Sequence, residues 1–218
     1  MDEAAQSDIT QYACFNDFFT RALKPGARPL ADAAFVCPVD GAISQLGHID
    51  GDQVFQAKGF PYSLSSLMGF TPRTGELVES LKNGTYVTLR LTSSMYHRFH
   101  APADATLTHV THISGDTWNV NPIALKRVEQ LFCKNERAVL HMRTQSGEPF
   151  LIVPVAAVLV ASMRLHAVDV LLNLRYRGPN EIPCQAHYTK GQEMGWFEHG
   201  STILVFVPPG YDWAEGFE

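Results

Sequence analysis

Apolar and polar residues alternate along much of the chain after residue 34, and this period of two predicts β-strands. The segments YVTLRLT, ATLTHVTHI and AVLHMRT alternate in this way, and FVCPVDGAISQLG has turn residues between strand formers. LIVPVAAVLVA and TILVFV are apolar almost throughout, which predicts strands buried on both faces. We therefore expect a mainly β (α+β) fold, in which residues 1–218 form a single domain with antiparallel sheets around one core.

Helical periodicity is confined to short segments. In CFNDFFTRAL the apolar residues recur at helical spacing until Pro25 and Gly26 end the pattern. SLSSLMG predicts a second short helix. The chain contains no repeat, low-complexity tract or obvious linker.

Charge, cysteine spacing and hydropathy exclude several classes of protein. The 17 basic and 22 acidic residues give a net charge of −5 without a basic run, so we expect no nucleic-acid partner. Four widely spaced cysteines fit neither a zinc module nor a disulfide scaffold and favour a reducing, cytoplasmic setting. The longest apolar run, residues 151–161, is shorter than the roughly 20 residues that span a bilayer, so membrane contact is expected to be peripheral.

Three groups of residues have the chemistry of a catalytic site. His97 and His100 in SMYHRFHAP follow a predicted strand and precede a proline, so we place them at a strand end or loop; on a strand their odd spacing would point them to opposite sides. Asp40 in CPVDGAI precedes a glycine, so it either accepts a hydrogen bond in a turn or orients an imidazole. Ser201 follows Gly200 at the start of the last strand, outside any GxSxG elbow.

A second histidine pair, His109 and His112 in HVTH, lies inside an alternating strand. Their spacing makes a shared metal site improbable, and we interpret both as structural. We expect no bound metal.

Seven segments together resemble the phosphatidylserine decarboxylases, which make their own pyruvoyl group by cutting themselves at a Gly-Ser bond. They occur in the family's order and cover nearly the whole chain: FNDFFTRALKPGARPL, CPVDGAI, AKGFPYSL, YHRFHAP, VNPIAL, LFCKNERAVL and KGQEMGWFEHGST. The resemblance implies cleavage of a proenzyme (zymogen) into a β chain of residues 1–200 and an α chain of residues 201–218.

The resemblance also implies the roles of the residues in cleavage. His100 removes the proton of the Ser201 hydroxyl while Asp40 orients the imidazole, as in a serine-protease triad. Ser201 then attacks the Gly200 carbonyl, and β-elimination followed by hydrolysis leaves a pyruvoyl group at position 201 and releases ammonia.

For turnover, the resemblance implies a carboxy-lyase that converts phosphatidylserine to phosphatidylethanolamine and CO2 through a Schiff base on the pyruvoyl group. His97 is expected to protonate the product. The expected location is the cytoplasmic membrane surface, and a homodimer is one option for the assembly. The segment GFPYSLSSLMGF is a candidate for membrane docking, with Leu67 and Met68 as test positions.

The sequence departs from the family at three positions. His199 replaces a usually apolar residue before the cleavage glycine, and Ala156 and Ala161 stand where the family tends to have glycine. Each alanine adds a methyl group that glycine lacks. If these groups lie near a pocket they narrow it, so the size of the substrate stays open.

Three other interpretations stay open at this point. The first is a related pyruvoyl enzyme for a soluble amino acid, and the second is an inactive, uncut binding domain on the same scaffold. The third, a metal hydrolase built on His97 and His100, is the least favoured because it needs a further carboxylate or thiolate ligand.

Overall fold

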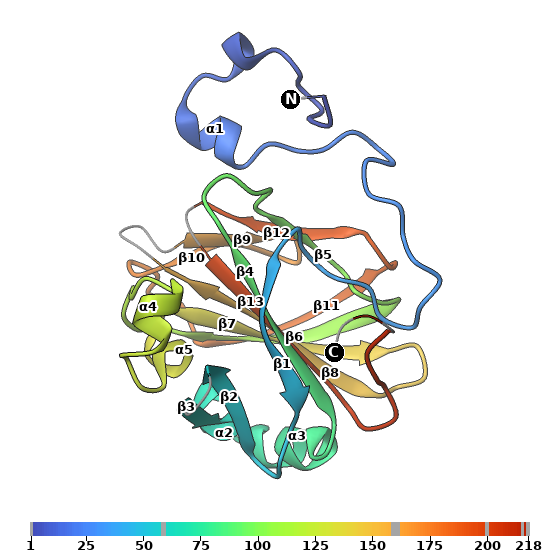
Figure 1. The fold of residues 1–218 in the computed structure, drawn as a ribbon, viewed down its shortest axis with the longest axis vertical. Helices are drawn as coiled ribbons and strands as arrows, with labels where there is room; N and C mark the ends of the chain where they lie inside the picture. The colour runs from blue at the N-terminus through green and yellow to red at the C-terminus, as the bar shows by residue number, and fades with distance from the viewer. Residues whose placement is uncertain (1, 58–59, 158–161, 199–200, 215, 217–218) are drawn as a thin grey trace.

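The largest element of the fold is a seven-stranded antiparallel sheet with the strand order β1-β4-β13-β8-β7-β6-β11. The computed structural model describes residues 2–57, 60–157, 162–198, 201–214 and 216. In spatial order the strands are β1 (Ala42–His48), β4 (Thr85–Leu91), β13 (Ser201–Val207), β8 (Pro149–Ala156), β7 (Arg137–Thr144), β6 (Ala105–Ile113) and β11 (Glu181–Tyr188). The strand at the end of the chain, β13, thus lies inside the sheet (Figure 1).

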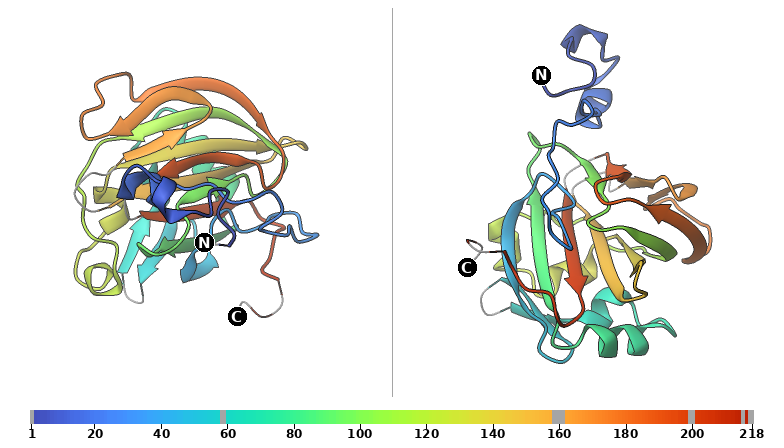
Figure 2. Two further views of the ribbon diagram at one scale, coloured as in Figure 1. Left: turned by 90° about the horizontal axis from the view of Figure 1, so that it is seen from above. Right: turned by 90° about the vertical axis from the view of Figure 1, so that its right-hand side faces the viewer.

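A four-stranded sheet packs against one face of the large sheet (Figure 2). Its strands are β10 (Val168–Asn173), β9 (Ser162–Leu165), β12 (Glu193–Phe197) and β5 (Arg98–His100). Apolar side chains of both sheets fill the space between them, among them Ile203 of β13 and Phe197 of β12. We call this side of the large sheet the inner face.

The opposite face of the large sheet is covered by a hairpin and short helices. These are β2 (Gln53–Ala57), β3 (Phe60–Ser63), α2 (Leu64–Met68), α3 (Thr74–Leu81), α4 (Pro122–Leu125) and α5 (Leu131–Lys134). A second apolar core, with Leu204 and Phe206 of β13, lies beneath them. Because β13 has a core on each face, all seven of its residues are buried, which explains its nearly continuous apolar sequence.

The amino-terminal arm extends beyond one end of the sheets (Figure 1). It contains a 3-10 helix, Ile9–Gln11, and α1 (Phe15–Phe19). Of the α1 residues only Phe19 is buried, and its ring lies 3.8 Å from that of His97, measured between centroids. The arm therefore contacts the two sheets close to the segment that contains His97 and His100.

The mainly β fold predicted from the sequence, with antiparallel sheets and a few short helices, is confirmed. The alternating segments form β4, β6 and β7, and the two apolar runs contain β8 and β13. The predicted first helix is shorter than its apolar pattern, since α1 ends at Phe19. In the described part of the chain, no helix has the length and apolar character needed to cross a bilayer.

Candidate active site

Ser201 is the first residue of β13, and its side chain is fully buried. Among the described residues, its Oγ has no hydrogen-bond partner. A buried hydroxyl without a partner costs about 1–3 kcal/mol, so its presence favours a chemical role over a structural one. Its neighbours His199 and Gly200 lie outside the described residues, so the structure describes only the carboxyl-terminal side of the expected cleavage site.

The two histidines, His97 and His100, lie just before and at the end of the short strand β5, and they differ in burial. His97 immediately precedes β5 and is fully buried, with its Nδ1 2.9 Å from the Met95 carbonyl oxygen. The backbone N–H of Phe197 donates to the His97 carbonyl oxygen. This bond sets His97 opposite Phe197, which is four residues before Ser201 in the sequence.

His100 ends β5 on the less buried side. Its Nδ1 lies 2.9 Å from the Gly191 carbonyl oxygen, and its Nε2 lies 3.2 Å from the Tyr96 hydroxyl. A carbonyl oxygen only accepts, so Nδ1 carries the hydrogen, and Nε2 of the neutral ring accepts from Tyr96. Burial raises the pKa of Tyr96, which keeps this donor protonated. His100 therefore has a basic lone pair on Nε2.

Asp40 is bonded to Arg28 rather than to His100. Arg28 Nε lies 3.0 and 2.9 Å from the two carboxylate oxygens of Asp40, and the same guanidinium pairs with Glu3 of the amino-terminal arm. The segments of Asp40 and His100 are nonetheless joined, because the His100 N–H donates to the Pro38 carbonyl oxygen at 2.9 Å. Asp40, Arg28 and Tyr96 share the lining of a polar pocket of about 250 Å³.

The strand register orders these groups relative to Ser201. β5 pairs with β12 so that Arg98 faces Trp196 and His100 faces Glu193. β12 precedes β13 in the sequence, and its last residue is Phe197. Along this ladder His97 lies opposite Phe197 and His100 opposite Glu193, so His97 faces the residue that is closer in sequence to Ser201.

Residue 156, one of the departures from the family, is directly beside Ser201 in the sheet. Ala156 pairs with Ser201, and both side chains are buried. The carbonyl oxygen of Glu136 accepts from the Ala156 N–H, so Glu136 continues the same row on the other side. Sequence reasoning assigned no role to Glu136, although it lies within LFCKNERAVL. Ala161 lies outside the described residues.

His109 and His112 point to opposite faces of β6. His109 Nε2 lies 2.6 Å from Glu181 Oε2, whereas His112 Nε2 lies 3.6 Å from Glu136 Oε1 on the inner face. The described residues contain no group of three or more histidine, cysteine or acidic side chains arranged to hold a metal.

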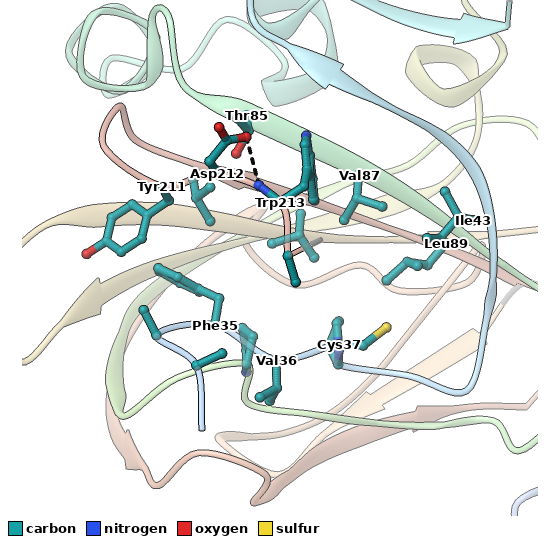
Figure 3. Close-up of a pocket in the computed structure, with 17 residues that line it drawn as sticks. Phe35, Val36, Cys37, Ile43, Thr85, Val87, Leu89, Tyr211, Asp212 and Trp213 are labelled. Atoms are coloured by element: carbon teal, nitrogen blue, oxygen red, sulfur yellow. Dashed lines mark hydrogen bonds between the residues drawn. The ribbon is translucent and has the colours of Figure 1, made fainter. Parts of the chain in front are cut away.

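An apolar pocket of about 330 Å³ lies farther along β13, toward its carboxyl-terminal end (Figure 3). Its wall includes Val87 and Leu89 of β4, Val205 of β13, and side chains of segments 33–38 and 211–214. Pro38, two residues before Asp40, is also part of the lining. The pocket therefore offers an apolar surface on the same strand that begins with Ser201.

Comparisons with known proteins identify the family of this chain. A family model described as phosphatidylserine decarboxylase matches residues 15–216. The phosphatidylserine decarboxylase proenzyme of Polaromonas naphthalenivorans (strain CJ2) is 44% identical over 227 residues, covering 99% of this chain and 77% of that protein. The proenzyme of Methylobacillus flagellatus is 45% identical over 216 residues, covering 95% and 74%, and that of Chromobacterium violaceum is 43% identical over 218 residues, covering 96% and 75%. The chain therefore belongs to the phosphatidylserine decarboxylase family.

Proposed function

We propose that this chain is a proenzyme that cuts itself between Gly200 and Ser201 and then decarboxylates phosphatidylserine to phosphatidylethanolamine. Family membership over residues 15–216 supports the reaction class. The observation that carries the proposal is the buried Ser201 hydroxyl, which has no partner among the described residues at the start of an internal strand. A structural serine at such a place normally donates to a backbone carbonyl.

His100 is the proposed base for the Ser201 hydroxyl, because its Nε2 has the lone pair that a base requires. In this role Asp40 orients the imidazole. For Asp40 to bond to His100, its pair with Arg28 has to open. Since the Arg28 and Asp40 side chains are both partly exposed, opening this pair costs about 1 kcal/mol or less.

The residues around position 201 fit a pyruvoyl group formed from Ser201 itself. The orphaned Oγ is the atom that would be eliminated, and pairing of β13 with both β4 and β8 would hold the new chain end in place. A pyruvoyl ketone supplies the electron sink that a decarboxylation needs. His97, buried opposite Phe197 of β12, is the proposed proton donor to the product.

The apolar pocket beside β13 supports a lipid over a free amino acid as the substrate. Val205 and Leu89 line this pocket, so a ligand with its polar end near Ser201 would find an apolar surface along the same strand. A free amino acid has no long hydrocarbon chain that would extend along this strand. We propose that the enzyme meets its substrate at a membrane surface, where such lipids reside.

Intact mass measurement under denaturing conditions tests self-cleavage. The wild type should give two fragments divided after Gly200, with the smaller one blocked to Edman sequencing and reactive toward a hydrazine reagent. Ser201→Ala should give one uncut, unreactive chain. A wild-type chain that stays whole on long incubation would contradict the proposal.

Two further variants separate the roles of the histidines. His100→Ala should remain uncut, whereas His97→Ala should be cut and yet decarboxylate at less than about 1% of the wild-type rate, in line with the loss of a general acid. The opposite pattern would reverse the assignment. Vesicles of phosphatidylserine, compared with free serine as the substrate, test the lipid preference.

A further inference from the structure

Glu136 is a buried carboxylate without a hydrogen-bond partner. Its side chain is fully buried, and neither carboxylate oxygen has a partner among the described residues. A buried charge is stable only when it is paired, so such a carboxylate indicates a binding site for a cation or a proton donor.

The residues on either side of Glu136 both have hydrogen-bond partners, so the lack of partners is confined to Glu136 in this segment. Asn135 uses its amide in bonds to Trp118 and Ala156. The side chain of Arg137 points to the face of the sheet opposite to Glu136. There it donates to the carbonyl oxygens of four residues, namely Ser66, Leu67, Cys133 and Asn135. Both neighbours are thus fully engaged, and the nearest cation in the sequence is not available to Glu136.

The side chain of His112 approaches this carboxylate. Its Nε2 lies 3.6 Å from Glu136 Oε1, which is too far for a hydrogen bond, and neither ring nitrogen has another partner among the described residues. On the opposite face of the same sheet, His109 and Glu181 form a direct bond of 2.6 Å. The looser inner pair leaves donor and acceptor capacity for a third group.

The strand register places this pair beside Ser201. Ser201 pairs with Ala156, and Glu136 continues the row on β7, so two strand spacings of about 4.8 Å separate the backbones of Ser201 and Glu136. All three side chains point to the inner face, because Ile203, Ala156 and Ala138 belong to the core on that face. Only the methyl group of Ala156 lies between them in the row.

The chemistry of the pair selects the ligand. A carboxylate only accepts hydrogen bonds, and a neutral imidazole adds one acceptor, so together they suit a compact cation with several N–H donors. A primary ammonium group has three such donors. We propose that Glu136 and His112 bind the primary ammonium group of the substrate next to position 201, an inference that rests on the proposed decarboxylase function.

Glu136 also takes up a proton from the bound ammonium group. One N–H bond breaks and one O–H bond forms on the carboxylate, which leaves a neutral amine and a neutral carboxylic acid in the buried site. The nitrogen thereby regains the lone pair that it needs to react with a carbonyl group. His112 acts as a positioning residue that holds the carboxylate and the nitrogen together.

A binding experiment tests this inference without requiring enzyme activity. In the Ser201→Ala chain, calorimetry should show glycerophosphoserine binding at least tenfold more tightly than its N-acetyl derivative, which lacks the ammonium group. Adding Glu136→Gln should abolish this preference, while Glu136→Asp should retain part of it. Glu181→Gln is the matched control, because it alters a carboxylate paired with a histidine on the opposite face, and it should leave the preference unchanged.

The same variants in the self-cleaving chain separate the inference from the proposed function. Glu136→Gln should still be cut, but its KM for phosphatidylserine should rise at least tenfold, whereas Glu181→Gln should match the wild type. If the wild type is inactive on phosphatidylserine, the proposed function fails. If the wild type is active and a folded Glu136→Gln variant keeps the wild-type KM and the preference for the ammonium group, the inference fails.

Ala156→Val provides a second variant in case Glu136→Gln does not fold. It leaves the carboxylate intact and adds two methyl groups to the residue in the row between residues 201 and 136. A β-branched residue suits a strand, but overpacking this buried position should cost about 1–3 kcal/mol, so the folding of the variant is checked by circular dichroism. The inference expects the same loss of preference for the ammonium group, and an unchanged preference would overturn it.

Discussion

Buried polar side chains in this protein fall into two sets that differ in their hydrogen bonding. Arg137 is buried, and burial lowers its pKa to about 10, yet four backbone carbonyl groups accept its hydrogen bonds. Ser201, Glu136 and His112 are equally buried, but their polar atoms lack hydrogen-bond partners within the described residues. The first pattern fixes structure, whereas the second leaves capacity for a reacting or binding partner.

His141 belongs to the structural set and makes folding sensitive to acid. It is buried on β7, its Nε2 lies 3.0 Å from the Thr111 hydroxyl, and burial with the nearby His109 lowers its pKa from 6.5 to about 4. Below pH 6.5 the unfolded chain takes up a proton that the folded chain refuses until about pH 4. The stability that neutral His141 provides is therefore complete above pH 6.5 and is lost as the pH falls toward 4.

Urea unfolding at pH 7 and pH 4.5 measures this effect. Between these two values, the wild type should lose roughly 2–3 kcal/mol more unfolding free energy than His141→Gln, from about 1.4 kcal/mol per pKa unit. The exposed His187 of β11 provides the control, and His187→Gln should follow the wild type. Parallel losses in wild type and His141→Gln would contradict this assignment.

Local sequence patterns predicted where along the strands the candidate site residues lie but not their partners. The sequence placed His97 and His100 at a strand end or loop, and the structure has His97 just before β5 and His100 as its last residue. The Arg28 that holds Asp40 and the Phe19 that covers His97 both come from the amino-terminal region, and no local pattern reports such distant contacts. Glu136 was missed for the same reason, since its closeness to Ser201 depends on the pairing of β7, β8 and β13.

At the scale of elements, strands with strong alternation were predicted and short ones were not. β4, β6 and β7 have long alternating sequences, because alternate side chains of each strand pack into the core on the inner face of the large sheet. The strands of the small sheet carry weaker signals, because β5 has three residues and β9 has four. Helices α3, α4 and α5 are also short, and their stability comes from packing on the sheet rather than from their own sequence.

Helix α2 changes how membrane docking by the Phe60–Phe70 segment has to be tested. Leu67 and Met68, the test positions chosen from the sequence, are buried in the core beneath the helices, whereas Phe70 is 73% exposed. Leu67→Asp would bury an unpaired charge and should lower the unfolding free energy by about 4 kcal/mol or more. Phe70→Asp should change it by less than about 0.5 kcal/mol.

Vesicle flotation with Phe70→Asp therefore replaces the test at Leu67 and Met68. If the exposed Phe70 ring inserts at the interface, the bound fraction on phosphatidylserine vesicles should fall to half or less. Leu174→Asp, which alters an exposed apolar residue after β10, is the control and should bind like the wild type. Equal binding by Phe70→Asp and wild type would exclude docking through this segment.

At the scale of the whole molecule, the position of β13 determines what self-cleavage can release. β13 lies between β4 and β8, is paired with both, and separates the two apolar cores. A fragment of residues 201–218 would thus keep a central strand of the large sheet. Its release would expose both cores, so it should require unfolding of the sheet.

Native mass spectrometry and size-exclusion chromatography of the cleaved protein test this prediction. The two fragments should remain together in native buffer and separate only over the urea range in which the sheet unfolds, because the same strand pairs and core contacts hold both. As a control, limited proteolysis of the exposed residues beyond Pro208 should shorten the small fragment without releasing it. If the small fragment elutes alone in native buffer, the pairing of β13 with β4 and β8 is not sufficient to keep the fragment bound, and the prediction is wrong.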